Sequence, residues 1–193
     1  TVIAAHAANQ TLYAKLPYDS VKSFEHVSLL VTSPLIVCAT NALAATNVKD
    51  LIELAKAKPG QLTFASSGVG AAAHLTTELF MATTGIKMTH VPYKGTAPAL
   101  QDLIGGQINF MMDTPMPAML PQVRAGKIKA LGMASDKRIG IAPEIPTLIE
   151  QGVQVVGGTW VALLAPAGTP KAIVDKLSGA AGAAMRRAEV KER

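Results

Sequence analysis

The strongest chemical signal in the sequence lies in FASSGVGAAAHL, residues 64–75, where a predicted strand turns into a predicted helix. Glycines let a ligand approach the backbone closely, and the first turn of a helix presents N–H groups without intrahelical partners. The helix dipole adds positive charge there, so the turn favours a carboxylate or a phosphate. A plain strand-to-helix turn with Ser67 as the helix N-cap is the alternative. The candidate ligand-binding residues of the turn are Ser66, Ser67, Gly68, Val69 and Gly70.

Two further strand-to-helix turns follow along the chain. In HVPYKGTAPAL a Lys-Gly turn precedes Thr96, which can cap the next helix, and QINFMMDTPMPA places Asp113 at the end of a strand. In open α/β sheets, ligands bind at the carboxyl ends of the strands. Asp113 is therefore expected to orient a water molecule or to bind a ligand amine, unless it only caps the following helix.

The histidines do not form a metal site. His74 falls in the first turn of the helix after the glycines, where it could donate a hydrogen bond to an anion or simply pack on the helix surface. His6, His26 and His90 are far apart and lack a metal-ligand spacing such as H-x-x-x-H. We therefore predict no bound metal.

Catalytic and cofactor motifs are incomplete. GVGAAA matches the dinucleotide pattern G-x-G-x-x-A, but such a site needs an acidic residue about 20 positions later. No Asp or Glu occurs between Glu78 and Asp102. There is no G-x-S-x-G nucleophile elbow and no evident pair of carboxylates for acid–base work. The sequence therefore predicts no catalytic residue and no cofactor.

Short apolar runs alternate with helical patterns along the chain, which predicts an α/β architecture with largely parallel sheets. Strands are predicted at 1–5, 34–40, 61–66, 88–93, 107–113, 127–134 and 159–166. Helices are predicted at 48–60, 71–85, 97–106, 117–126 and 170–190. Gly85 is the expected C-terminal glycine of one helix, and Thr169-Pro170 is the expected N-terminal cap pair of the last.

Two stretches with weak periodicity, 19–34 and 136–158, bracket a self-contained α/β block and predict two lobes. Ligands of two-lobed α/β proteins bind in the cleft between the lobes. Trp160 follows the second stretch and could line the mouth of this cleft or fill the core. The expected lobes are residues 34–158 and, discontinuously, residues 1–33 with 159–193.

The composition argues against a disordered chain, a membrane-spanning helix and a nucleic-acid-binding protein. Of the 193 residues, 49% are apolar and 16% are charged, and no apolar run approaches the ~18 residues of a transmembrane helix. The net charge of +5 is scattered, which suits a small anionic ligand better than a nucleic acid. The single cysteine, Cys38, lies in an apolar run and is expected to be a buried structural thiol. The chain starts without a signal-like segment and stops inside a charged helical pattern, so we expect both ends to be cut.

Several segments together resemble one protein family. They are LPYDSVKSFEHVSLL, ASSGVGAAAHLTTELF, HVPYKGTAPALQDLIGGQINFMMD, PQVRAGKIKALGMASDKR, PEIPTLIEQG and LLAPAGTPKAIVDKL, and they follow the family's consecutive signatures in order. The family is the periplasmic solute-binding proteins of tripartite tricarboxylate transporters, also called the Bug or TctC family. The resemblance covers essentially the whole chain.

The resemblance implies a type II periplasmic binding protein fold, in which two α/β lobes close over a small carboxylate at the hinge. It implies that the turn Ser66–Gly70 holds a ligand carboxylate and that Asp113 selects the rest of the ligand. The expected partners are a small organic acid (a di- or tricarboxylate, an amino acid or an aromatic acid) and the membrane permease subunits. A monomer in the periplasm that binds no nucleic acid is expected. Further ligand contacts are expected from His6, Ala8, Thr159 and Trp160.

The sequence departs from the family pattern near its ends. AAHAANQ stands where members often have GTHAINP, and the family's earlier strand, its Pro/Gly-rich loop and its C-terminal helices are absent. The resemblance therefore implies a complete lobe at 34–158 and an incomplete second lobe. A doubly wound α/β enzyme, or a ligand-sensing module that uses the same glycine turn, is the alternative function.

Overall fold

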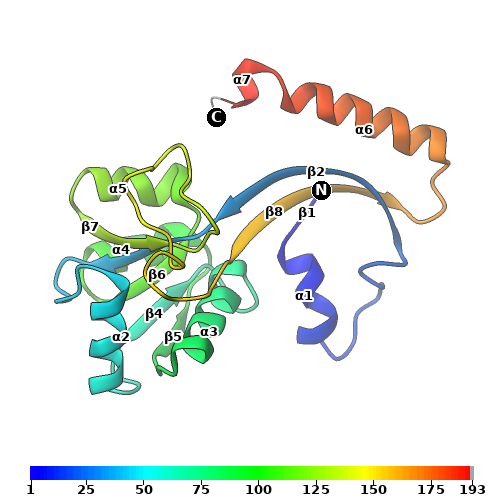
Figure 1. The fold of residues 1–193 in the computed structure, drawn as a ribbon. Helices are drawn as coiled ribbons and strands as arrows, with labels where there is room; N and C mark the ends of the chain where they lie inside the picture. Colours follow the sequence, from blue (N-terminus) through cyan, green and yellow to red (C-terminus); the bar gives the residue numbers. More distant parts are fainter. Residues whose placement is uncertain (192–193) are drawn as a thin grey trace. The chain divides into compact units, whose positions relative to one another are not determined.

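The computed structural model describes residues 1–191, in which the chain forms two compact units. The larger unit comprises Ser33–Gly158, and the smaller unit comprises Thr1–Thr32 with Thr159–Arg193 (Figure 1). The chain therefore passes from one unit to the other at 32–33 and again at 158–159.

Five strands form the sheet of the larger unit: β3 (Ile36–Thr40), β4 (Thr63–Ser66), β5 (Thr89–Pro92), β6 (Phe110–Asp113) and β7 (Ile128–Met133). Their order across the sheet is β5-β4-β6-β3-β7. β4 pairs in parallel with β5 on one side and with β6 on the other. The apolar runs of the sequence predict a strand at each of these positions, and the α/β class is confirmed.

The direction of β3 departs from the expectation of a largely parallel sheet. β3 runs antiparallel to both of its neighbours, β6 and β7. All of its residues are buried, and a strand that is buried on both faces is typically a continuous apolar run. Such a run indicates a central strand but carries no information about its direction.

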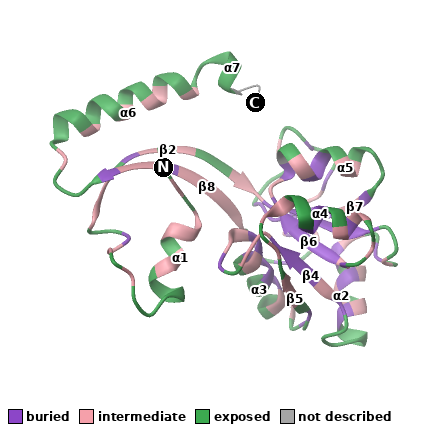
Figure 2. Ribbon diagram, turned by 180° about the vertical axis from the view of Figure 1, so that it is seen from behind, coloured by how far each residue is buried: buried purple, intermediate pink, exposed green. Residues whose placement is uncertain are grey.

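Helices pack on both faces of this sheet. α2 (Val48–Ala57) and α3 (Ala72–Thr84) contribute to one core cluster, whereas α4 (Thr96–Ile104), the π-helical turn η1 (Pro115–Met119) and α5 (Leu120–Arg124) contribute to the other. Successive residues of β3 alternate between the clusters, with Val37 in the first and Cys38 in the second. Cys38 is fully buried, as the sequence predicts, and this burial raises the pKa of its thiol. Figure 2 shows the buried residues concentrated in this unit.

Two helix ends lie where glycine or a capping side chain in the sequence favours them, and one predicted helix is divided. Gly85 ends α3 in a left-handed conformation, with a φ of 69°, as the sequence predicts. Asn47 caps α2, since its Oδ1 accepts the N–H of Asp50 at 2.9 Å. The predicted single helix at 117–126 is instead divided between η1 and α5. Pro121 lies in the first turn of α5 and has no N–H to donate into a continuous helix.

The smaller unit contains a three-stranded sheet in the order β1-β8-β2. Its strands are β1 (Val2–Ile3), β2 (Phe24–Pro34) and β8 (Gly158–Pro166). The last two residues of β2 and the first residue of β8 belong to the larger unit. The strand predicted over 1–5 is only two residues long, because the helix α1 (Ala5–Leu12) begins directly after it. The sequence does not predict β2. Val27 is its one buried residue, so no regular apolar alternation marks the strand.

Helices α6 (Lys171–Met185) and α7 (Ala188–Lys191) follow β8. No residue of α1 or α6 is buried. The prediction that Thr169 and Pro170 cap this helix is wrong, because the hydroxyl of Thr169 donates to the carbonyl of Pro166 at 2.7 Å and α6 begins after Pro170.

Among the helices that the structure describes, none is long and apolar enough to cross a membrane.

Gly157 and Gly158 let segments of the larger unit approach one another closely. The carbonyl of Gly157 accepts the N–H of Leu35 at 3.1 Å. A Cβ at Gly157 would lie 2.2 Å from Cγ2 of Thr76 on α3, and a Cβ at Gly158 would lie 2.5 Å from the carbonyl oxygen of Ser33. Any larger residue at either position must therefore displace its neighbours.

We expect Gly157→Ala to lower the free energy of unfolding by about 1–3 kcal/mol, because its methyl group overlaps the short side chain of Thr76. Gly140→Ala is the matched control, since a Cβ there meets nothing within 4 Å. Urea unfolding of both variants measures the difference, and adding Thr76→Ala should restore part of the loss. Equal stability of the two glycine variants would contradict the overlap.

Candidate functional site

The carboxyl ends of β4, β5 and β6 meet at one edge of the sheet because these strands run in the same direction. The N–H of Gly95, after β5, donates to the carbonyl of Ser67, after β4, at 3.1 Å. The hydroxyl of Thr96 donates to Oδ2 of Asp113, the last residue of β6, at 2.8 Å. The structure therefore brings the glycine turn, Ser66–Gly70, together with Asp113 at the edge where ligands of α/β sheets bind.

The glycine turn uses some of its own hydrogen-bond donors. Gly68 and Gly70 have φ values of 150° and 79°, which other residues rarely adopt. The N–H of Gly70 donates to Nδ1 of His74 at 3.1 Å, and the N–H of Ala71 donates to the carbonyl of Gly68 at 3.2 Å. Other N–H groups at the turn donate to no residue in the described part of the chain: those of Ser67, Val69, Ala72, Ala73 and His74.

The two serines of the turn differ in what their hydroxyls can reach. Ser66 has none of its surface exposed (0%), and its Oγ lies 2.7 Å from Nε2 of His90 and donates to the carbonyl of Gly68. Such a pair resembles a nucleophile and its base, but a serine closed off from solvent cannot attack a substrate. Ser67 is partly exposed. It does not cap α3, whose N-cap is Ala71, so that alternative is wrong.

A stack of three rings lies against the turn. His90 on β5 stacks with Phe64 on β4 and with His74 on α3, at centroid distances of 4.7 and 4.1 Å. Burial, and then the charge of His74, lower the pKa of His90. Nε2 of His74 lies 3.6 Å from Oε1 of Glu78, so both ring nitrogens of His74 have partners within the protein. Only the strand register pairs His90 with Phe64, so the sequence does not predict this stack.

Asp113 is a buried carboxylate, with 6% of the residue exposed. Its Oδ1 accepts the N–H of Thr114 at 2.7 Å, and its Oδ2 accepts the hydroxyl of Thr96. Asp113 does not cap the next helix, because Thr114 is the N-cap of η1. Among the residues that the structure describes, no Lys, Arg or His forms an ion pair with Asp113. The site thus combines neutral donors with one carboxylate, which suits a ligand that carries both a carboxylate and a donor group.

The turn between β5 and α4 is tied to the rest of the site. The hydroxyl of Tyr93 donates to Oδ2 of Asp102 at 2.6 Å, and burial, with a smaller effect of this carboxylate, raises the pKa of Tyr93 to about 12. Gly95, at a φ of 111°, is the N-cap of α4, so the expected cap by Thr96 is wrong. The Thr96 hydroxyl binds Asp113 instead, which joins this turn to β6.

The remaining predicted site residues belong to the smaller unit. Nε2 of His6, in α1, lies 2.9 Å from the carbonyl oxygen of Ser20, and the ring stacks on an aromatic neighbour. Ala8 is half-buried in the same helix. Thr159 and Trp160 lie on β8, and Trp160 lines an apolar hollow of about 570 Å³ that is formed by β2 and β8. The His6 ring is therefore engaged within its own unit.

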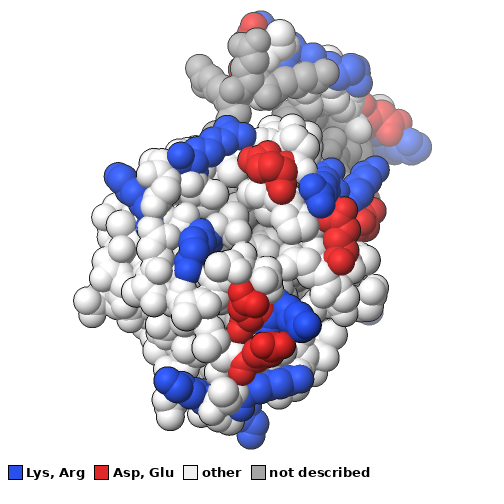
Figure 3. Space-filling model, turned by 60° about the vertical axis from the view of Figure 1, so that its left-hand side comes forward, with Lys and Arg blue, Asp and Glu red and all other residues white. Residues whose placement is uncertain are grey.

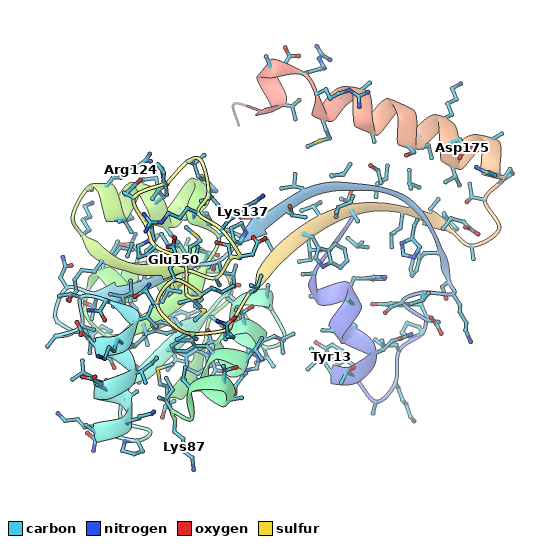
Figure 4. All side chains as sticks on the ribbon, in the orientation of Figure 1. Tyr13, Lys87, Arg124, Lys137, Glu150 and Asp175 are labelled. Carbon is cyan, nitrogen blue, oxygen red and sulfur yellow. The ribbon has the colours of Figure 1, made fainter. Side chains whose placement is uncertain are left out.

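Charged side chains are interspersed on the surface. Lys and Arg alternate with Asp and Glu on the face shown in Figure 3. Lys87 and Arg124 project from the edges of the larger unit in Figure 4. Oε2 of Glu150 lies 3.0 Å from Nε of Arg138. Within residues 1–191, no group of three or more His, Cys, Asp or Glu side chains is placed to hold a metal ion.

The fold and the site define the class of protein. An α/β fold of this kind is that of the periplasmic binding proteins, one of which superposes on 98% of this chain with a TM-score of 0.87. The family model "Tripartite tricarboxylate transporter family receptor" matches residues 1–193, and the chain belongs to this family. The fold and the family implied by the sequence resemblance are thereby confirmed.

A curated relative and two solved structures are also similar to this chain. BugT of Bordetella pertussis (strain Tohama I) is 37% identical over 87% of this chain and 52% of its own length. The structure of R. palustris Rpa4515 with adipate is 35% identical, with a TM-score of 0.83, over 92% of this chain and 60% of that one. MatC (Rpa3494) from Rhodopseudomonas palustris with bound malate is 33% identical, with a TM-score of 0.85, over 96% and 63%. The chain spans about half the length of the curated relatives that it matches.

We expect His90 to make the protein less stable as the pH falls. An unfolded histidine binds a proton near pH 6.5, whereas the lowered pKa of His90 keeps the folded state neutral to lower pH. The contribution of His90 is therefore complete above about pH 6.5 and is lost as the pH falls through the folded pKa. His90→Gln keeps a polar group for Ser66 and does not titrate. Urea unfolding between about pH 7.5 and 5 should show a smaller loss for this variant, and an equal loss would contradict the expectation.

Proposed function

We propose that this protein is an extracytoplasmic receptor that binds a small organic acid in the periplasm and delivers it to the membrane permease subunits of a tripartite tricarboxylate transporter. The observation that carries the proposal is the set of unpartnered N–H groups at the glycine turn and the start of α3. Membership of the receptor family supports it. The receptor acts by binding alone, as a monomer, without catalysis, a cofactor or a metal ion.

The glycine turn supplies the donors for one ligand carboxylate. The N–H groups of Ser67 and Val69 and those at the start of α3 donate to its oxygens, and the Ser67 hydroxyl adds another donor. Hydrogen bonds to a charged group contribute about 1.5–3 kcal/mol each, and the end of the helix dipole adds about 0.3–1 kcal/mol. Ser66, Gly68 and Gly70 shape the turn, since their polar groups are engaged within it.

Asp113 selects the rest of the ligand. Its carboxylate repels a second carboxylate placed directly against it and accepts a hydrogen bond from a hydroxyl, an amine or a bridging water. Malate, the ligand in MatC, carries a hydroxyl of this kind. Adipate, the ligand in Rpa4515, has none and would need a bridging water at such a position. The proposed ligand class is therefore a small carboxylate, with preference for one that bears a hydroxyl or an amine.

The family resemblance adds four further ligand contacts to the proposal: His6, Ala8, Thr159 and Trp160. Because the His6 ring is held by Ser20, its segment would offer backbone groups rather than the imidazole. Trp160 is the only tryptophan in the chain. Its fluorescence is therefore a specific reporter of ligand binding close to β8.

An α/β enzyme and a ligand-sensing module are the alternative functions. The buried Ser66 presents no nucleophile to solvent, and no observation of this structure favours the enzyme. A sensing module would bind the same ligands and would differ in having a signalling partner in place of a permease. Recovery of the ligand unchanged after incubation with the protein separates a receptor from an enzyme.

We expect the thermal unfolding midpoint to rise with one class of small carboxylates in a panel of malate, adipate, citrate, amino acids and aromatic acids. A ligand at about 100 times its dissociation constant adds about 2.7 kcal/mol of stability, which corresponds to a shift of several degrees. NAD is the negative control. No shift with any acid, or a shift with NAD alone, would contradict the proposed function.

We expect Ala72→Pro to weaken carboxylate binding without destabilising the fold. Ala72 is the first residue of α3 and follows Ala71, whose φ of −64° and ψ of 157° suit the position before a proline. Proline is favoured there and removes one N–H that has no partner in the helix. Ala72→Val, which keeps the N–H, is the matched control. Calorimetric titration should show about a tenfold loss for the proline variant alone, as expected for one charge-assisted bond. Equal affinities would show that this N–H does not contact the ligand.

A further inference from the structure

We propose that His74 is a positioning residue that holds the glycine turn in its ligand-binding conformation, so that a proton on His74 and the ligand carboxylate compete. The inference rests on the proposed function, because it concerns the carboxylate that the turn would bind. It gives His74 an indirect role: its ring holds Gly70, while the N–H groups of Ser67 and Val69 receive the ligand.

The geometry fixes the protonation state that this role requires. The N–H of Gly70 donates to Nδ1 of His74 at 3.1 Å, so Nδ1 must carry a lone pair rather than a proton. In a neutral ring the one proton is then on Nε2, which lies 3.6 Å from Oε1 of Glu78. Gly70 is buried and has a φ of 79°. The bond to His74 is the contact that fixes the direction of the Gly70 N–H.

The titratable groups that face His74 act in opposite directions. His90, from β5, stacks on it with ring centroids 4.1 Å apart, so two positive charges at this place are unfavourable. Glu78, one turn further along α3, favours the charged form, but its side chain is 47% exposed and its effect is screened by water. Phe64, from β4, completes the stack and carries no charge. These three side chains and the N–H of Gly70 are the groups that face the His74 ring.

Protonation of Nδ1 turns the acceptor into a donor. Two donors then face each other, so the N–H of Gly70 loses its partner and the turn loses the contact that fixes it. A turn that must be ordered at the moment of binding gives a weaker complex than one that is already ordered. The loss of one such hydrogen bond corresponds to about a threefold to tenfold decrease in affinity.

The test uses calorimetric titration of malate and of adipate into the wild type, His74→Asn and His74→Ala at about pH 7.5 and 5.5. Asn places a non-titrating acceptor, Oδ1, where His has Nδ1, whereas Ala has none. Near pH 7.5 we expect His74→Asn to bind like the wild type and His74→Ala to bind about threefold to tenfold more weakly. On acidification the wild type should lose about threefold to tenfold more affinity than His74→Asn, since the titration of the ligand itself is common to both.

Identical pH profiles for the wild type and His74→Asn, or tighter binding by the wild type at low pH, would overturn the inference. If neither acid binds the wild type at either pH, the proposed function fails for these ligands, and the ligand-free protein still tests His74. The amide resonance of Gly70 should titrate together with the His74 ring in the wild type and stay constant in His74→Asn. A Gly70 resonance that does not respond to the protonation of His74 would overturn the positioning role.

Discussion

The parallel pairing of β4 with both β5 and β6 is the constraint on which the site depends. Only strands that run in the same direction end at the same edge of a sheet. The register sets Ser66 opposite Pro92 and Ala65 opposite Met111, so the turns that follow these strands become neighbours. The hydrogen bonds from Gly95 to Ser67 and from Thr96 to Asp113 are consequences of this pairing.

Some N–H groups of the glycine turn donate to protein acceptors, and others remain available to a ligand. The N–H of Gly70 donates to His74 and that of Ala71 donates to Gly68, whereas the N–H groups of Ser67 and Val69 donate to no residue in the part of the chain that the structure describes. Ser66 and His90 close the inner side of the turn, because the serine is buried and its hydroxyl is bonded to the ring. A turn of this kind can bind an anion with neutral groups alone, since the dipole and the fixed N–H groups replace a basic side chain.

The two units differ in how many of their residues are buried. The larger unit has two core clusters, one on each face of its sheet, and close approaches at Gly157 and Gly158. In the described part of the smaller unit, the buried apolar residues are Val27, Ala162 and Ala165, and neither α1 nor α6 buries a residue. The glycine turn and Asp113 thus lie in the unit that contains both core clusters.

The sequence by itself determined what local chemistry controls. The glycine turn, the strand end at Asp113, the buried thiol of Cys38 and the end of α3 at Gly85 were all predictable, because apolar runs and glycines act through neighbouring residues. Only the tertiary structure decided that β3 runs against its neighbours, that β2 exists and that His90 stacks on His74. It also decided which N–H groups of the turn are free. Each of these features depends on strand direction, on register or on a partner far along the chain. A pattern of side-chain types predicts which face of a strand a residue occupies, but it does not predict which strand lies beside it.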